Sequence, residues 1–134
     1  MSWFRSLRRP NVAVFRLQGP LDNTKVHFLH KAIENLDWMR NVKAVACVIE
    51  SNGGSGVQAD LMTKILRDYC DKKAIPLYSF AETECLGGAM IPLLSADKVF
   101  AQKYAILGRL TAGTSVISST ETYGIKRWTA PTEG

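Results

Sequence analysis

The sequence has few of the residues that carry metal or disulfide chemistry. Its 134 residues include three cysteines, Cys47, Cys70 and Cys85, and two histidines, His27 and His30. Three cysteines without metal-ligand spacing give no disulfide framework and are typical of a reducing compartment. The two histidines lie three positions apart in an expected helix, with no third ligand near them, so we expect them to face solvent. We therefore expect no metal and no cofactor.

The sequence also lacks a long apolar run. The longest uncharged apolar stretch near the middle, residues 85–96, is shorter than the roughly 20 residues that a membrane-spanning helix needs. We find no secretory hydrophobic region either. With 46% hydrophobic and 22% charged residues, the composition is that of one globular domain with a core of its own.

Acidic residues are missing from the first 21 positions, although the net charge is only +5. This stretch holds Arg5, Arg8, Arg9 and Arg16, and residues 1–9 mix arginine, serine and bulky apolar side chains. Such a mixture is typical of a mitochondrial presequence, and it also suits a short basic arm that lies on a partner or on the domain. We expect residues 1–11 to form a basic arm. Under the first interpretation this arm is an uncleaved targeting segment, and the protein is located in the mitochondrial matrix.

Apolar periodicity predicts strands that alternate with helices. Strands are expected at residues 12–17, 43–49, 75–80, 98–101 and 105–107, with helices after Asn23 or Thr24, after Ser55 and after Gly87. This alternation predicts an α/β domain with a mainly parallel sheet and right-handed crossovers. The continuous apolar run at 43–49 predicts a strand that is buried on both faces.

Two apolar stripes mark the core faces of the first two expected helices. In the first helix they are Val26, Leu29, Ile33, Leu36 and then Met39 or Arg40, and in the second Val57, Leu61, Ile65 and Tyr69. Both sets recur at helical spacing, which predicts that they face the sheet.

The composition changes after Thr111, where serine, threonine and glycine dominate as far as Gly124. We therefore expect residues 12–112 to form the domain and residues 113–134 an extended tail. The tail contains Ile125-Lys126-Arg127-Trp128, and a tryptophan is unusual in free polar coil. Trp128 therefore either packs back on the domain or anchors a partner.

Two glycine pairs stand directly after expected strands. Gly53-Gly54-Ser55 follows the strand at 43–49, and Leu86-Gly87-Gly88 opens the third helix about thirty residues later. Glycines let backbone N–H groups turn toward one point, where such donors stabilise an oxyanion. The sequence therefore predicts an oxyanion-hole-like loop at Gly53, Gly54 and Ser55.

These motifs resemble the ClpP/crotonase superfamily, and most closely its signal-peptide-peptidase (SppA-like) serine protease branch. Residues 42–55 are similar to that branch's strand and Asn-Ser-Pro-Gly-Gly-Ser loop, with Glu50 and Asn52 as departures. Ala96-Asp97-Lys98 is similar to the branch's Ala-Asp-Lys, and Gly108 to the glycine that follows it. The resemblance implies a ClpP/crotonase-like fold of repeated β-β-α and βαβ units, here in truncated form.

The same resemblance implies that the catalytic serine is replaced. Leu86 stands where the branch has Ser before Gly-Gly, and leucine offers no hydroxyl or thiol for attack. The lysine base of the branch would fall about where this sequence ends, and no residue can be assigned to it. Leu86, Gly87 and Gly88 are therefore expected to form a degenerate site without a catalytic residue.

Two enzymatic alternatives stay open. Cys85 offers a thiol beside Leu86, although a small buried core thiol is the expected role. Glu82 and Glu84 could serve as acid or base on thioester substrates, as acidic residues do in the crotonase branch, although a solvated edge or a contact with a basic surface is the commoner role. The eight residues between Gly88 and Asp97 also match the spacing in enoyl-CoA hydratases and isomerases.

The sequence thus favours a catalytically inactive structural subunit of a larger assembly, such as a mitochondrial ribosome, a respiratory complex or an ATP synthase. Arg5, Arg8, Arg9 and Trp128 are the expected contacts with other protein subunits. RNA contact through basic residues of the two arms and self-association are further expectations. An active serine-protease-like hydrolase and an acyl-CoA-binding crotonase-type enzyme are the alternatives.

Overall fold

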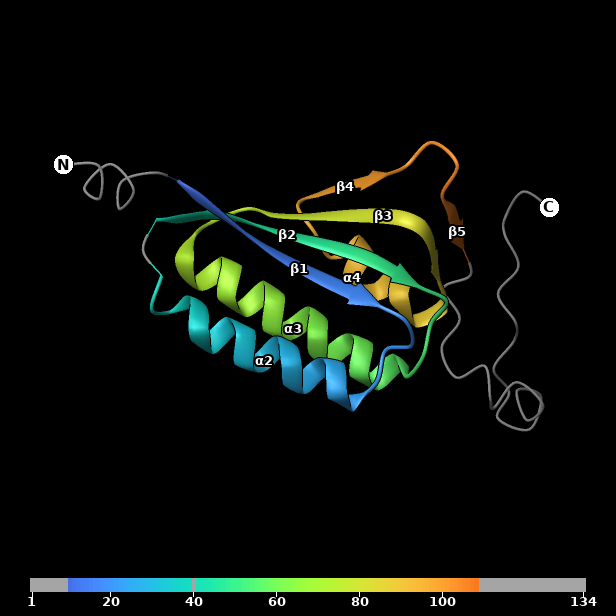
Figure 1. The fold of residues 1–134 in the computed structure, drawn as a ribbon, viewed down its shortest axis with the longest axis horizontal. Coiled ribbons are helices and arrows are strands. Elements are labelled where there is room, and N and C mark those ends of the chain that lie inside the picture. The colour runs from blue at the N-terminus through green and yellow to red at the C-terminus, as the bar shows by residue number, and fades with distance from the viewer. Residues whose placement is uncertain (1–9, 40, 109–134) are drawn as a thin grey trace.

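The computed structural model describes residues 10–39 and 41–108 (Figure 1). In chain order the elements are β1 (Asn11–Gln18), α2 (Asn23–Leu36), β2 (Val42–Ser51), α3 (Gly56–Lys73), β3 (Leu77–Leu86), the short 3-10 helix η1 (Gly87–Ala89), α4 (Met90–Leu94), β4 (Lys98–Ala101) and β5 (Ile106–Gly108). This order confirms the predicted alternation of strands and helices. The third strand is longer than predicted, because it continues past Phe80 to Leu86.

The strands form one sheet in the order β1-β2-β3-β4, and β5 pairs with the last residues of β3. Each of these pairings is parallel. The sheet is therefore the α/β arrangement that the sequence predicts. The register between β2 and β3 shifts where Ile49 pairs with Ala81 and Ser51 with Cys85, so β3 carries extra residues near its carboxyl end.

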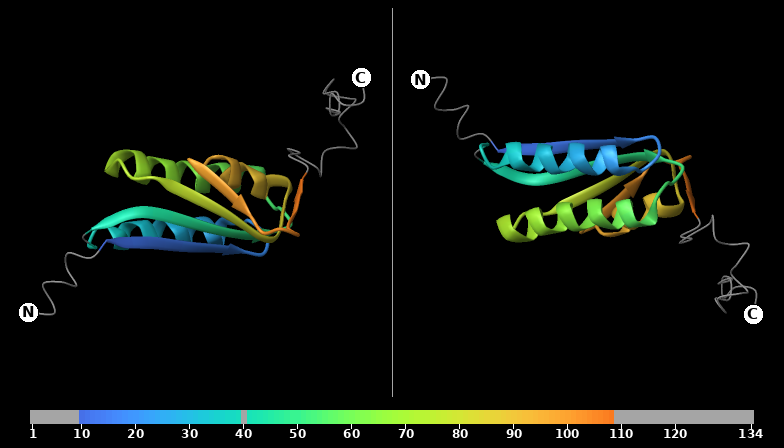
Figure 2. Two further views of the ribbon diagram at one scale, coloured as in Figure 1. Left: turned by 90° about the horizontal axis from the view of Figure 1, so that it is seen from above. Right: turned by 90° about the horizontal axis from the view of Figure 1, so that it is seen from below.

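The helices lie on one face of this sheet. Successive strands are neighbours and always step in the same direction, so right-handed crossovers bring every connecting helix to the same side. Phe15 and Leu17 of β1 are buried on that side, whereas Val12 and Val14 are each 57% exposed on the other. Figure 2 shows the two sides, with the strands in front in one view and α2 and α3 in front in the other.

The prediction that β2 is buried on both faces is wrong in part. Val45, Cys47 and Ile49 are buried against the helices. On the opposite face Val48 is only partly buried, and none of the described elements covers it. The apolar run of β2 reflects its central place in the sheet, between side chains of β1 and β3, rather than a second layer of helices.

The N-cap of α2 lies one residue before Asn23, the first of the two predicted caps. Asp22 is the N-cap, because its Oδ1 accepts the backbone N–H of Lys25 at 3.1 Å and the hydroxyl of Thr24 at 2.5 Å. Leu29 and Leu36 are buried as predicted. The helix ends at Leu36, so Met39 lies outside it and is 53% exposed.

The predicted core stripe of α3 is wrong at two of its four positions. Val57 is 70% exposed and Leu61 is 41% exposed. The buried residues of this helix are instead Ala59, Met62, Leu66, Tyr69 and Cys70. These residues recur every three to four positions, and the helix is rotated so that small Ala59 and flexible Met62, rather than the β-branched and leucine side chains beside them, face the sheet.

Candidate active-site region

The loop after β2 is tied to the start of α2. The hydroxyl of buried Ser51 accepts the Gly53 N–H at 3.1 Å and lies 3.1 Å from the Gly53 carbonyl. That carbonyl also accepts the N–H of Leu21 at 2.9 Å, and the Leu21 carbonyl accepts the N–H of Ser55 at 3.0 Å. The loop is thereby held in one conformation at the carboxyl end of the sheet.

Two glycines of this loop have backbone angles that other residues rarely adopt. Gly53 has φ +122° and Gly54 has φ +142°. A Cβ atom on Gly54 would lie 2.5 Å from the Leu21 carbonyl oxygen and 2.6 Å from its nitrogen. Glycine is therefore required at position 54 by the close passage of the Leu21 backbone.

The second glycine pair meets the first. Leu86 ends β3, and η1 begins at Gly87, which turns the chain with φ +57° and is followed by buried Gly88. A Cβ on Gly53 would lie 3.4 Å from the Leu86 carbonyl oxygen and 3.8 Å from the Gly88 nitrogen. The structure thus brings together the two motifs that the sequence singled out, at the edge where ligands of open α/β sheets bind.

Several donors of the predicted oxyanion-hole-like loop already have acceptors within the chain. The N–H of Gly53 is donated to Ser51, and the N–H of Ser55 to Leu21. The Ser55 side chain caps α3, where its Oγ accepts the N–H of Gln58 at 3.3 Å. Two of the three amides in the predicted set therefore stabilise the fold.

Cys85, the thiol beside Leu86, is a core residue. It is fully buried, and its Sγ lies 3.2 Å from the carbonyl oxygen of Ala89, to which the thiol donates. Burial raises the pKa of Cys85 to about 11. The attacking species of a cysteine nucleophile is the thiolate, which this environment disfavours. The predicted role of Cys85 as a buried core thiol is confirmed.

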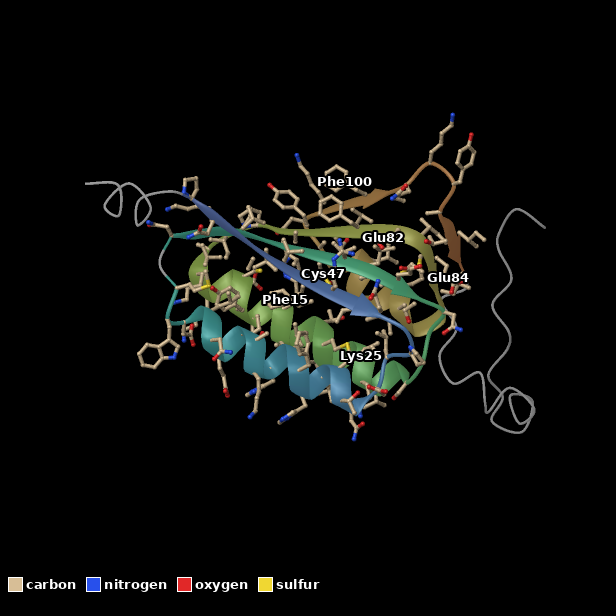
Figure 3. All side chains as sticks on the ribbon, viewed as in Figure 1. Phe15, Lys25, Cys47, Glu82, Glu84 and Phe100 are labelled. Carbon is tan, nitrogen blue, oxygen red and sulfur yellow. The ribbon has the colours of Figure 1, made fainter. Side chains whose placement is uncertain are left out.

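Glu82 and Glu84 both belong to β3. A glutamate oxygen of Glu82 lies 2.9 Å from a guanidinium nitrogen of Arg16, so this carboxylate has a cationic partner from β1. Glu84 stands opposite Ile106 of β5. Glu82 comes two positions after Phe80 on β3 and so lies on the same face of the sheet as Phe80 and its neighbour Phe100. Figure 3 labels Glu82, Glu84 and Phe100. The ion pair with Arg16 holds Glu82 over the middle of the sheet rather than at the glycine loops.

Asp97 forms a second tie within the fold, which was not predicted from the sequence. A carboxylate oxygen of Asp97 accepts the N–H of Leu77 at 2.7 Å and lies 3.3 Å from a guanidinium nitrogen of Arg67. The backbone N–H of Asp97 donates to the Leu77 carbonyl at 2.8 Å. The hydrogen bond from Leu77 and then the Arg67 guanidinium lower the pKa of Asp97. The Asp of Ala96-Asp97-Lys98 therefore anchors the start of β3.

The other site residues predicted from the sequence lie either outside the described residues or on α2. Arg5, Arg8, Arg9 and Trp128 lie outside the described residues. His27 and His30 are exposed on α2, as predicted.

Over residues 10–39 and 41–108 there is no group of three or more His, Cys, Asp or Glu side chains that could hold a metal ion. None of the helices described here has the length and apolarity to span a membrane.

Strand order, the one-sided helical layer and the paired glycine loops define a ClpP-like α/β fold, and solved structures of that fold match the chain. No protein-family model and no curated protein sequence matches it.

Two of the matching structures are particularly informative. A ClpP1 mutant from Listeria monocytogenes aligns with a TM-score of 0.66 at 13% sequence identity, over 92% of this chain and 68% of its own. A mutant of 1510-N, a membrane-bound stomatin-specific protease, aligns with a TM-score of 0.59 at 12% identity, over 75% of this chain and 47% of its own. The chain thus covers about half of the second protein. Identities this low establish the fold alone.

Proposed function

We propose that this chain is a non-catalytic member of the SppA-like branch of this fold, with Leu86 in place of the nucleophile. The single observation that carries the proposal is the state of three side chains of β3: Leu86 and Cys85, where the two glycine loops meet, and Glu82, over the middle of the sheet. Leu86 is aliphatic, neighbouring Cys85 is buried with a raised pKa, and Glu82 is paired with Arg16. Acyl transfer needs an activated nucleophile, and none of these three side chains supplies one.

The function proposed for such a chain is that of a structural subunit in a larger mitochondrial assembly. The support comes from the sequence, because residues 1–9 combine Arg5, Arg8 and Arg9 with serine and bulky apolar residues. Guanidinium groups form bidentate contacts with carboxylates and phosphates, so the arm suits an acidic protein surface or an RNA backbone in the assembly.

The test replaces the three arginines in the full-length protein expressed in its own cells. The variant Arg5→Gln, Arg8→Gln, Arg9→Gln is compared with a control in which Lys31, Lys43 and Lys64, all exposed on the domain, become glutamine. Both lose three positive charges. Subcellular fractionation and native gel mobility are the measurements.

We expect the arginine variant to leave the mitochondrial fraction or the high-mass band, and the lysine control to remain there. An arm variant that stays at wild-type levels in both would overturn the subunit proposal. A wild-type protein that runs as a free monomer in lysate would overturn it as well.

A further inference from the structure

The helix-free face of the sheet, here called the bare face, carries an apolar surface crossed by the Arg16–Glu82 ion pair. Its apolar members are Val12, Val14, Ala46, Val48, Tyr78, Phe80 and Phe100. Cross-strand register sets them in rows, since Val14 lies opposite Ala46, Ala46 opposite Tyr78, and Phe80 opposite Phe100. Val12 and Val14 are 57% exposed and Phe100 is 46% exposed. Parallel sheets are normally covered on both faces, so this face needs an occupant.

The bare face is hollowed near its centre. A shallow depression of about 280 Å³ lies between Val48, Phe80 and Phe100, with Glu82 and Gln102 at its rim. The rings of Phe80 and Phe100 stack with their centroids 5.1 Å apart. Glu82 is already paired with Arg16, so the hollow itself, with its aromatic walls, fits a large aromatic side chain.

The size of the bare face favours an occupant from the same chain. Four strands about 4.8 Å apart and about 20 Å long present an area of about 400 Å². A stable dimer normally buries about 800 Å² on each partner, so two bare faces alone would form a weak pair. A segment on the same chain binds at a high effective concentration and needs far less area.

Residues 109–134 supply such a segment. The described chain ends at Gly108, which pairs with Leu86 at the carboxyl edge of the sheet. Trp128 follows 20 residues later, and an extended chain of that length reaches about 65 Å, well beyond the width of the sheet. Lys126 and Arg127 precede Trp128, and Glu50 at this end of the bare face has no cationic partner among the described residues.

We infer that the segment Ile125–Trp128 covers the bare face, with the Trp128 indole in the hollow at Phe80 and Phe100. Lys126 and Arg127 then lie near Glu50. Of the two roles that the sequence leaves open for Trp128, this is the intramolecular one. The inference concerns the opposite side of the sheet from α2 and α3, and it does not rest on the proposed function.

Tryptophan fluorescence of the full chain tests this directly. The chain has three tryptophans, so Trp3→Phe with Trp38→Phe leaves Trp128 as the only emitter. The matched variant, Trp3→Phe with Trp128→Phe, leaves Trp38, which is 88% exposed and serves as the solvent reference. We expect Trp128 to emit at shorter wavelength than Trp38 and to be quenched several-fold less by acrylamide.

Substitutions on the two sides of the domain then locate the contact. Phe100→Glu places a charge in the hollow and should shift the docking equilibrium of Trp128 at least about tenfold toward solvent. Phe28→Glu, on α2 and 58% exposed, should leave the quenching of Trp128 unchanged. Val14→Glu is a second bare-face variant, used if circular dichroism shows that Phe100→Glu does not fold.

Three outcomes would overturn the inference. The first is a Trp128 as accessible to acrylamide as Trp38. The second is protection that persists in folded Phe100→Glu and Val14→Glu. The third is protection that rises with protein concentration together with a dimeric mass in light scattering, which would make a second copy the occupant.

Discussion

At the scale of single residues, Gly54 and Gly56 stand two positions apart under different constraints. Gly54 has φ +142° and passes so close to Leu21 that a Cβ would meet two of its backbone atoms. Gly56 is the first residue of α3, and a Cβ there would meet nothing within 4 Å. Gly54 is therefore required by its backbone conformation and by the Leu21 backbone beside it, whereas a side chain at Gly56 would meet no steric obstacle.

We expect Gly54→Ala to lower the free energy of unfolding by about 3 kcal/mol, because it combines an unfavourable φ with a backbone clash. Gly56→Ala should be neutral or should stabilise the protein by about 0.5–1 kcal/mol, since alanine favours the helix and restricts the unfolded chain. Urea unfolding followed by circular dichroism measures both. Equal effects of the two substitutions would contradict the role assigned to Leu21.

At the scale of elements, Asp97 ties the start of β3 to α3 through Leu77 and Arg67. We expect Asp97→Ala to destabilise the protein by about 1–2 kcal/mol, because the Leu77 N–H loses its side-chain acceptor. Asp97→Asn keeps an acceptor oxygen and should cost less than about 1 kcal/mol, since the lost ion pair with Arg67 is partly exposed and screened by solvent.

The pH dependence provides a check on the Asp97 tie. The pKa of Asp97 is lowered in the folded state, so its stabilising effect is present above the ordinary value of 3.8 and is lost as the pH falls through the folded pKa. The stability difference between wild type and Asp97→Asn should therefore shrink below about pH 4. A difference that stays constant from pH 7 to pH 3 would show that the charge of Asp97 has no part in the tie.

Local patterns in the sequence were sufficient to predict most elements. The strand at 98–101 has the predicted bounds, and Leu29 and Leu36 face the core as their spacing indicates. The rotation of α3 was mispredicted, because Val57 and Leu61 are apolar at helical spacing yet lie beside the buried face. The open side of β2 follows from the order of the strands in the sheet, which local periodicity does not encode.

Part of the candidate site was also predictable from the sequence. Both glycine pairs were found from their positions after strands, and the structure brings them into contact. The ties that fix them were not predicted, since Leu21 bonds to Gly53 and Ser55 more than thirty positions away. Such long-range backbone bonds leave no local mark in a sequence.

At the scale of the whole molecule, three buried thiols make the free energy of unfolding vary with pH in the alkaline range. Burial raises the pKa of Cys47 from 9.0 to about 12, and those of Cys70 and Cys85 from 9.0 to about 11. Above pH 9 the unfolded chain loses these protons while the folded chain keeps them, so the equilibrium shifts toward unfolding.

We expect the free energy of unfolding to fall between pH 9 and pH 11, by up to about 1.4 kcal/mol per pH unit for each thiol. Urea midpoints across this range are the measurement. The control variant Cys47→Ala, Cys70→Ala, Cys85→Ala should show a much flatter profile, whatever its stability at neutral pH. An equally steep fall in this variant would assign the alkaline loss to other groups, such as tyrosines.

If Leu86 has replaced the nucleophile, as proposed, the region around it forms no covalent intermediate. Intact-mass spectrometry of the native chain after incubation with a fluorophosphonate probe, and separately with an acyl thioester, tests this most directly. We expect an unchanged mass in both reactions, because Leu86 has no nucleophilic atom and Cys85 is buried as a neutral thiol. One adduct per native chain, lost when the protein is denatured before the reagent is added, would contradict it.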